Sequence, residues 1–303
     1  GWAWPKILAA AAPISSPIFL RQSNLIAKIL RLLVLGIGLA GCSLFPGANS
    51  SGRLSSNRSR ITTPPSNPAD MLQMVQANTR FGVDLYQALR KQNDQNLFFS
   101  PYSISLALAM TEAGARGETR SEMDNVLHFD LPQERLHPAM NALDLALRAA
   151  PPAQMDPEDK EKVFQLSIAN SVWGQKDYPF EQAYLDLLAE QYGAGLRIAD
   201  FRKDAEGARE QINAWVSEET REKIQELIPT GALDEASRLV LANAIYFKAG
   251  WLETFDPDST GPAQFTLLDS STKDIWMMAQ SGYFPYASGD GWQALELPYV
   301  GQT

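Results

Sequence analysis

The sequence has few of the residues on which metal or nucleophilic catalysis depends. Its 303 residues include one cysteine, Cys42, and two histidines, His128 and His137. One cysteine excludes an internal disulfide and a thiolate zinc cluster. The H-E-x-x-H, G-x-S-x-G and G-x-x-x-x-G-K-[ST] motifs are also missing from the sequence. We therefore expect a protein that is not an enzyme and that uses no metal and no cofactor.

A serine–histidine–aspartate triad is the catalytic alternative that counting leaves open, with His128 or His137 as the base. His128 ends a predicted helix, and His137 follows a turn marked by a proline. Histidines in such places more often cap helices or lie at the surface than act as bases. We predict a surface or capping role for both, and a hydrolytic protein is the less favoured alternative.

Acidic residues are absent from the first 69 positions, which contain seven lysines and arginines. The remainder holds the other 19 basic residues and all 35 acidic residues. Nucleic acid requires a basic binding surface, so an acidic body argues against a nucleic-acid partner. The basic first part has the charge expected of an export signal instead.

Residues 1–42 have the features of such a signal. Lys28 and Arg31 precede an apolar run at residues 32–40, which is shorter than the roughly 20 residues of a membrane-spanning helix. The sequence Leu-Ala-Gly-Cys at residues 39–42 resembles the lipobox of bacterial lipoproteins, in which the signal is cut before an acylated cysteine. We expect export and a lipid anchor on Cys42 at the periplasmic or extracellular side of a membrane; the alternative is an incidental cysteine in a short apolar helix.

Residues 43–69 contain seven serines and four prolines, a composition that predicts a flexible linker. From residue 70 the pattern is typical of a globular domain, with helices early, strands late and some strands threaded between the helices, which favours an α+β fold. The predicted helices span 70–92, 101–114, 117–128, 136–149, 184–192 and 205–223. The predicted strands span 96–99, 163–173, 196–201, 239–251, 263–268, 273–278, 282–285 and 292–297.

The most informative stretch is the run Leu239 to Phe255. It begins as a nearly continuous apolar segment, which is typical of a strand buried on both faces. Asn243 interrupts this run, and a buried asparagine must find hydrogen-bond partners or cost stability. The sequence therefore predicts a fixed polar contact inside an otherwise apolar layer.

Several segments together carry a resemblance to a known family. They follow one another in the expected order and spacing from about residue 70 to residue 303, which makes chance agreement very unlikely. The segments that carry the resemblance are Asn96–Ile104, Gly114–Thr119, Ala169–Gly174, Ile212–Val216, Leu241–Lys248, Met277–Met278 and Leu295–Tyr299. Through them the domain from residue 70 to residue 303 resembles the serpins, the serine-proteinase-inhibitor fold.

The resemblance implies a fold with a large sheet A, smaller sheets B and C and surrounding helices. It assigns conformational rather than catalytic roles to particular residues. Ser100, Ser103 and Asn243 would belong to a polar cluster beneath the separating strands. Trp251 would lie near the top of sheet A, where a loop first enters, and Lys248 belongs to the same strand segment. Asn213 and Thr220 would lie on the helix that yields as the new strand passes.

The implied activity is inhibition of a serine or cysteine protease by a monomeric suicide substrate. The protease attacks an exposed loop, and the cut loop inserts into sheet A as a new strand. By the same resemblance, residues 70–303 cover about the N-terminal three quarters of the domain, so we expect the reactive loop to lie beyond Thr303. The alternative is a non-inhibitory serpin that acts as a surface binding or chaperone-like protein.

Overall fold

The computed structural model describes residues 53–54, 56–91, 97–148, 165–267 and 269–300. The predicted signal at residues 1–42 and its Cys42 lie outside these residues. The chain divides into two compact units. The first unit comprises Gly1–Arg148 and Ser167–Ile245, and the second comprises Ala149–Leu166 and Tyr246–Thr303. Among the described helices, none is both long enough and apolar enough to cross a membrane.

The helices of the first unit begin where side chains supply the missing hydrogen bonds of a first turn. Asn67, Ser100 and Asp204 each accept a bond from the backbone N–H three residues later. Proline follows the first two of these caps, where its fixed φ suits a helix start. The helices are α2 (Pro68–Leu89), α3 (Pro101–Glu112), α4 (Gly117–Leu127), α5 (Gln133–Arg148), α6 (Gln182–Tyr192) and α7 (Ala205–Glu219).

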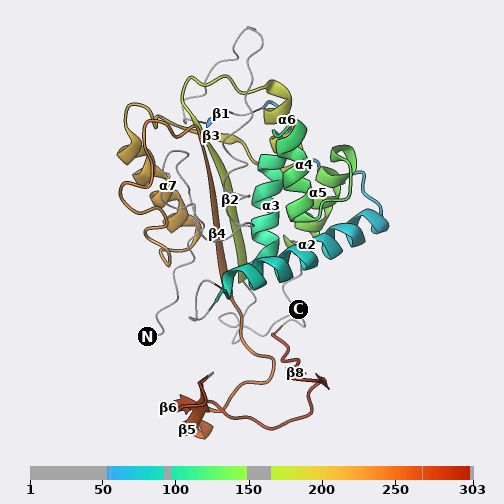
Figure 1. Cartoon of the computed structure of the whole chain (residues 1–303), viewed down its shortest axis with the longest axis vertical. Coiled ribbons are helices and arrows are strands. Elements are labelled where there is room, and N and C mark those ends of the chain that lie inside the picture. The colour runs from blue at the N-terminus through green and yellow to red at the C-terminus, as the bar shows by residue number, and fades with distance from the viewer. Residues whose placement is uncertain (1–52, 55, 92–96, 149–164, 268, 301–303) are drawn as a thin grey trace. The chain divides into compact units, whose positions relative to one another are not determined.

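The sheet of the first unit has four strands in the order β1-β3-β2-β4. Strand β3 pairs in parallel with β2 and antiparallel with β1. The strands are β1 (Arg53–Leu54), β2 (Gln165–Gln175), β3 (Leu196–Ala199) and β4 (Leu239–Lys248). Figure 1 shows α7 on one side of β2 and β4 and α3 on the other. The sheet is therefore a middle layer, and its two faces pack against different helices.

The position of β4 in this middle layer explains why its sequence is apolar. Val240, Ala242 and Ala244 belong to the core cluster around α7, which also contains Trp215 and Ile212. Leu239 and Leu241 pack against the other cluster, formed with side chains of α3 and α6. Because successive side chains of a strand point to opposite faces, both faces of β4 need apolar residues. The predicted buried strand is confirmed, and Asn243 falls on the α3 side.

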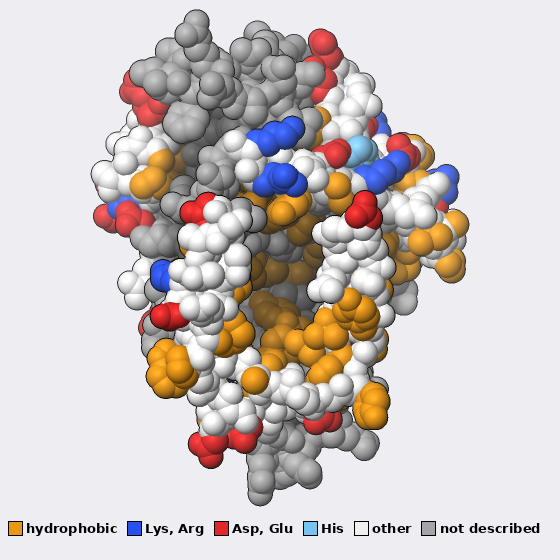
Figure 2. Space-filling model, turned by 60° about the horizontal axis from the view of Figure 1, so that its bottom comes forward, with side chains coloured by type: hydrophobic (Ala, Val, Ile, Leu, Met, Phe, Trp, Pro, Cys, Tyr) orange, Lys and Arg blue, Asp and Glu red, His pale blue; other side chains and the backbone are white. Residues whose placement is uncertain are grey.

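The second unit contains two antiparallel hairpins. Strand β5 (Gly261–Thr266) pairs with β6 (Thr272–Met277), and β7 (Tyr286–Gly289) pairs with β8 (Trp292–Leu295). A short 3-10 helix at Pro257–Ser259 precedes them. Both hairpins carry large apolar side chains at the surface, and Figure 2 shows such side chains gathered in several places on one face of the molecule. The exposed ones in the hairpins include Phe265, Trp276, Met277, Tyr286, Trp292 and Leu295.

The α+β class is confirmed, and most predicted elements form with shifted ends. The predicted strand at 96–99 is wrong over residues 97–99, which lack regular structure; they come directly before the Ser100 cap. The predicted strand at 282–285 is also misplaced, because pairing begins at Tyr286. Helix α7 ends at Glu219 rather than at residue 223, since Arg221 and Glu222 adopt positive φ. The pattern of polar and apolar residues does not indicate where these elements begin and end.

The predicted linker at residues 43–69 also differs from a free tether over its described part. Residues 53–54 form β1, and the segment that follows binds α5 and α6 through polar contacts. Pro68 and Ala69 already belong to α2. Composition correctly marks this segment as lacking a core of its own, but a segment without a core can still dock on a neighbouring one.

Candidate functional site: a polar cluster between the sheet and α3

Helix α3 is buried nearly all round. Its apolar residues from Leu106 to Met110 are buried, and so are the hydroxyl-bearing Ser103 and Ser105. Ser100 caps the helix, its Oγ accepting a bond from the Ser103 N–H at 3.2 Å. The cap fixes where the first turn begins and so determines which residues of α3 face the sheet. Ser103 is one of them.

Ser103, Asn170 and Asn243 form the polar cluster of the first unit. The Asn243 Nδ2 group donates to the Ser103 carbonyl oxygen at 3.1 Å, to Ser103 Oγ and to Asn170 Oδ1 at 2.5 Å. Asn170 Nδ2 in turn donates to the Ser103 carbonyl oxygen at 3.3 Å. Strands β2 and β4 are thereby joined to each other and to α3 at one point, which we call the Ser103–Asn243 cluster.

This cluster lies in an apolar layer, so its contacts are costly to break. Ser103 is fully buried and Asn243 is 8% exposed. A buried polar group that loses its partner costs about 1–3 kcal/mol. The two strands can separate from α3 without this cost only if these groups find new partners. The cluster therefore stabilises the arrangement in which β2 and β4 lie against α3. The predicted polar contact of Asn243 is confirmed.

Asn213 and Thr220 have a different task. The Asn213 side chain accepts bonds from the N–H groups of Leu227 and Ile228 at 3.0 and 2.9 Å and donates to the Ile228 carbonyl oxygen at 2.9 Å. Thr220 caps the C-terminal end of α7 and accepts a bond from the Ile224 N–H at 3.2 Å. Both residues fasten the segment after α7 to that helix. Their bonds are separate from the Ser103–Asn243 cluster.

Lys248 and Trp251 belong to the second unit. Lys248 is exposed at the end of β4. Trp251 stacks on Tyr299 with ring centroids 4.7 Å apart and forms an isolated antiparallel bridge with it. Trp251 also meets the edge of Phe255 at 6.2 Å. Trp251 thus lies in an aromatic cluster, and its predicted role at the entry point of a loop stays a prediction.

Asn170 is the member of the cluster that sequence reasoning did not single out. It lies in the matched segment Ala169–Gly174, whose alternation indicates a half-buried strand. A polar residue in such a strand usually faces solvent, so Asn170 gave no warning of a buried contact. The signal that could have found it is the pairing of two asparagines, one in each of two strands that the family resemblance places in sheet A.

The two histidines do not form a triad. His128 adopts the left-handed conformation at the end of α4, and its Nε2 lies 2.7 Å from Asp84 Oδ2, so the predicted capping role is confirmed. The prediction for His137 is wrong, because this residue lies on the buried face of α5 and is 1% exposed. Its Nδ1 lies 2.7 Å from the Tyr192 hydroxyl, and its Nε2 lies 3.4 Å from Glu112 Oε2.

Within the part of the chain that the structure describes, no group of three or more histidine, cysteine, aspartate or glutamate side chains is arranged to hold a metal ion. The interactions at the Ser103–Asn243 cluster are bonds between amides, a hydroxyl and a carbonyl, which can hold a conformation but supply no nucleophile with a base. The site is therefore suited to a conformational role.

Comparison with known proteins finds relatives of this chain. The leukocyte elastase inhibitor of Sus scrofa is 40% identical over 235 residues, which are 77% of this chain and 59% of that protein. Serpin B3 of Homo sapiens is 37% identical over 239 residues, 77% of this chain and 61% of that protein. The chain thus spans about three fifths of the length of these relatives.

Solved structures agree in fold. Emu (Dromaius novaehollandiae) ovalbumin matches with a TM-score of 0.67 and 28% identity, over 76% of this chain and 61% of that one. The native stressed conformation of AtSerpin1 from Arabidopsis matches with a TM-score of 0.65 and 28% identity, over 77% of this chain and 58% of that one. A profile of the family "Serpin (serine protease inhibitor)" matches residues 76–303. The chain belongs to the serpin family.

Proposed function

We propose that the protein carrying this chain inhibits a serine protease by suicide-substrate trapping. The observation that carries the proposal is the buried Ser103–Asn243 cluster, which holds two neighbouring strands to the helix beneath them. Family membership and relatives named as elastase inhibitors support the same activity. In this proposal the protein acts as a monomer. The free energy released by a conformational change drives the inhibition, and the protein catalyses no reaction.

The mechanism follows from the layers of the first unit. In this proposal the further strand joins the sheet at β4, which lies next to β2 in the strand order. A protease that attacks an exposed loop forms an acyl-enzyme, and the freed end of the loop then adds to the sheet as a strand. Each new ladder bond and buried side chain makes the change more favourable, which gives it one direction.

The Ser103–Asn243 cluster controls when this change occurs. Before cleavage, its bonds keep β2 and β4 fixed on α3 and oppose premature movement of the sheet. Asn213 and Thr220 fasten the segment after α7 to that helix, which packs over the same sheet. A helix and its following segment that are held by a few side-chain bonds can shift as a unit and then return.

The test is the formation of a covalent complex between the purified protein and a panel of trypsin-like, chymotrypsin-like and elastase-like serine proteases. We expect a complex with at least one of them that survives boiling in detergent and has the summed mass of protease and inhibitor fragment. A cysteine protease belongs in the same panel as the second target class. Cleavage by every protease without any such complex would contradict the proposal and favour the non-inhibitory alternative.

We further propose that Cys42 carries a lipid anchor and that the exported protein lies at the periplasmic or extracellular side of a membrane. The support is the sequence at residues 39–42 after an apolar run with a basic flank. The test expresses the protein with its leader in a bacterium and follows membrane fractionation of Cys42→Ser against the unchanged protein. Release of the variant into the soluble fraction is the expected result, and equal membrane association of both would refute the anchor.

A further inference from the structure

The segment before α2 crosses from the edge of the sheet to two helices. Residues Arg53 and Leu54 pair antiparallel with Arg197 and Leu196 of β3. Without this pairing β3 would present an open edge, and open strand edges invite pairing with other chains. We call residues 53–54 and 56–61 the strap. Its first two described residues extend the sheet by one short strand.

The middle of the strap is fixed to α6. Ser56 Oγ donates to Asp186 Oδ1 at 2.5 Å, and the Ile61 backbone N–H donates to the Glu190 carbonyl oxygen at 2.9 Å. Arg58 lies 3.4 Å from the Glu190 carboxylate, but its side chain is 64% exposed, so this ion pair contributes little. The contacts that define the docked position are those of Ser56 and Ile61.

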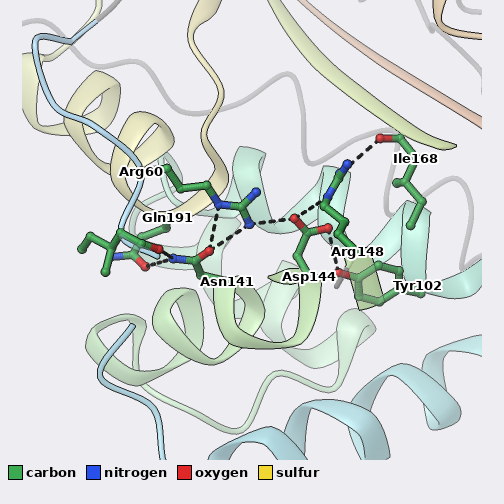
Figure 3. A network of polar contacts seen from close by, with 8 residues as sticks. Arg60, Tyr102, Asn141, Asp144, Arg148, Ile168 and Gln191 are labelled. Carbon is green, nitrogen blue, oxygen red and sulfur yellow. Dashed lines mark hydrogen bonds and ion pairs between the residues drawn. The ribbon is translucent and has the colours of Figure 1, made fainter. Parts of the chain in front are cut away.

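Arg60 makes the strongest contact of the strap, and Figure 3 shows it reaching across to α5. Its Nε and Nη2 donate to Asn141 Oδ1 at 3.0 and 2.8 Å, and Nη2 also donates to Asp144 Oδ2 at 2.7 Å. Asn141 returns a bond from its Nδ2 to the Ile61 carbonyl oxygen at 2.8 Å. Side chain and backbone of the strap are thus held by one asparagine.

The side chains of α5 that bind Arg60 are polar and buried. Asn141 is fully buried and Asp144 is 2% exposed. Asp144 also binds Arg148 at 2.8 Å and the Tyr102 hydroxyl at 3.2 Å, so Arg60 is the second guanidinium that this buried carboxylate holds. At Gly193, which ends α6 with positive φ, an added Cβ would lie 2.8 Å from Arg60 Cδ. A side chain larger than hydrogen at that position would displace the arginine.

We propose that the strap is an intramolecular clamp that closes the outer edge of the sheet and ties β3 to α5 and α6, with Arg60 as its anchor. It joins the sheet to the helices at the edge opposite to β4, whereas the Ser103–Asn243 cluster joins them through β2 and β4. Its regulatory consequence, which rests on the proposed function, is that a docked strap slows movement of the sheet and a released strap speeds it.

The first test measures the clamp itself and needs no protease. Hydrogen exchange is followed in the full chain for Arg60→Ala, with Arg58→Ala as the matched control, since both remove one arginine from the strap. We expect amides of β3 and of Ile61 to exchange about tenfold faster or more in Arg60→Ala, because a charged hydrogen-bond set to a buried acceptor is lost. The control should match the unchanged protein. Equal exchange in all three proteins would overturn the clamp.

The second test locks the strap in the folded protein. Ser56→Cys and Asp186→Cys are combined in a Cys42→Ser background, so that Cys42 cannot compete with the introduced pair. Failure of this disulfide to form under mild oxidation would contradict the docked position. With the disulfide formed, we expect slower complex formation with a susceptible protease than after reduction, while the Cys42→Ser background alone shows no redox effect.

The outcomes separate the clamp from the proposed function. Equal rates in the oxidised and reduced forms would refute the regulatory consequence, although the clamp could still pass the exchange test. If no protease forms a complex in either form, the proposed function fails, and hydrogen exchange alone decides on the clamp.

Discussion

Among single residues, Asn243 connects the sheet to α3, because its side-chain amide donates hydrogen bonds to both the Ser103 and the Asn170 side chains. Asn243→Ala leaves the buried Ser103 hydroxyl and the half-buried Asn170 amide oxygen without their donor. We expect a loss of about 1–3 kcal/mol in the free energy of unfolding, measured by urea denaturation. Asn125→Ala on the exposed side of α4 is the control and should change stability by less than about 0.5 kcal/mol. Equal effects of the two substitutions would contradict the role of the cluster.

His137 makes the free energy of unfolding depend on pH. Burial lowers its pKa from 6.5 to about 4, so the folded protein resists protonation that the unfolded chain accepts. Stability from this group is therefore present above pH 6.5 and lost as the pH falls toward 4. Acting alone it would amount to on the order of 3 kcal/mol across that interval. Burial raises the pKa of the neighbouring Glu112 carboxyl, which contributes with the opposite sign.

The thermal midpoint between pH 7 and pH 4.5 checks this account. We expect the midpoint of His137→Gln to fall less on acidification than that of the unchanged protein. Glu112→Gln removes the opposing term, so its midpoint should fall more. Parallel curves for all three proteins would show that neither buried group titrates as described.

How far single residues could be predicted depended on how unusual each is in its local sequence. Asn243 stands out in an apolar run, and its buried bonds followed directly from that contrast. Asn170 sits in an alternating strand where a polar residue is ordinary. His137 follows a turn marked by a proline, which suggested a surface or capping place, yet it lies within α5 on the buried side of that helix. Burial of this kind arises from the packing of distant helices and leaves no local trace.

Among the elements, α7 and the segment after it form one fastened piece. Asn213 holds residues 227 and 228, and Thr220 holds Ile224. Asn213→Ala should release this segment without unfolding α7, so amides of Leu227 and Ile228 should exchange about tenfold faster or more. Glu210→Ala, at an exposed position of the same helix, is the control. Unchanged exchange at both amides would contradict the role of Asn213.

Elements were predictable where both faces of a segment are constrained. Strand β4 and helix α3 are apolar on all sides because each lies between layers, and both formed as expected. The strap shows the opposite case. Its serine-rich and proline-rich composition predicts a linker, yet Arg60 docks on Asn141, 81 residues away in sequence. Local composition indicates whether a segment can fold alone. It does not indicate whether another part of the chain supplies a surface that binds the segment.

At the scale of the whole molecule, the family was predictable from the sequence because its motifs fall on the buried contacts. The segments that carried the resemblance include α3, with Ser103, and β4, with Asn243, which the fold brings into direct contact. In the proposed function, the energy of the conformational change depends on a strand that joins the sheet, and no pattern within one segment states how favourable that is.

The central claim is that the sheet accepts a further strand beside β4 when the proposed reactive loop is cut. The most direct test compares the thermal midpoint before and after cleavage of that loop by a protease that is not trapped. Strand insertion adds ladder bonds and buried surface, so we predict a rise on the order of 10 °C or more, given roughly 2–4 °C per kcal/mol in domains of about 150–250 residues. The unchanged protein, incubated without protease, is the reference. A midpoint that stays the same or falls after complete cleavage would contradict the account.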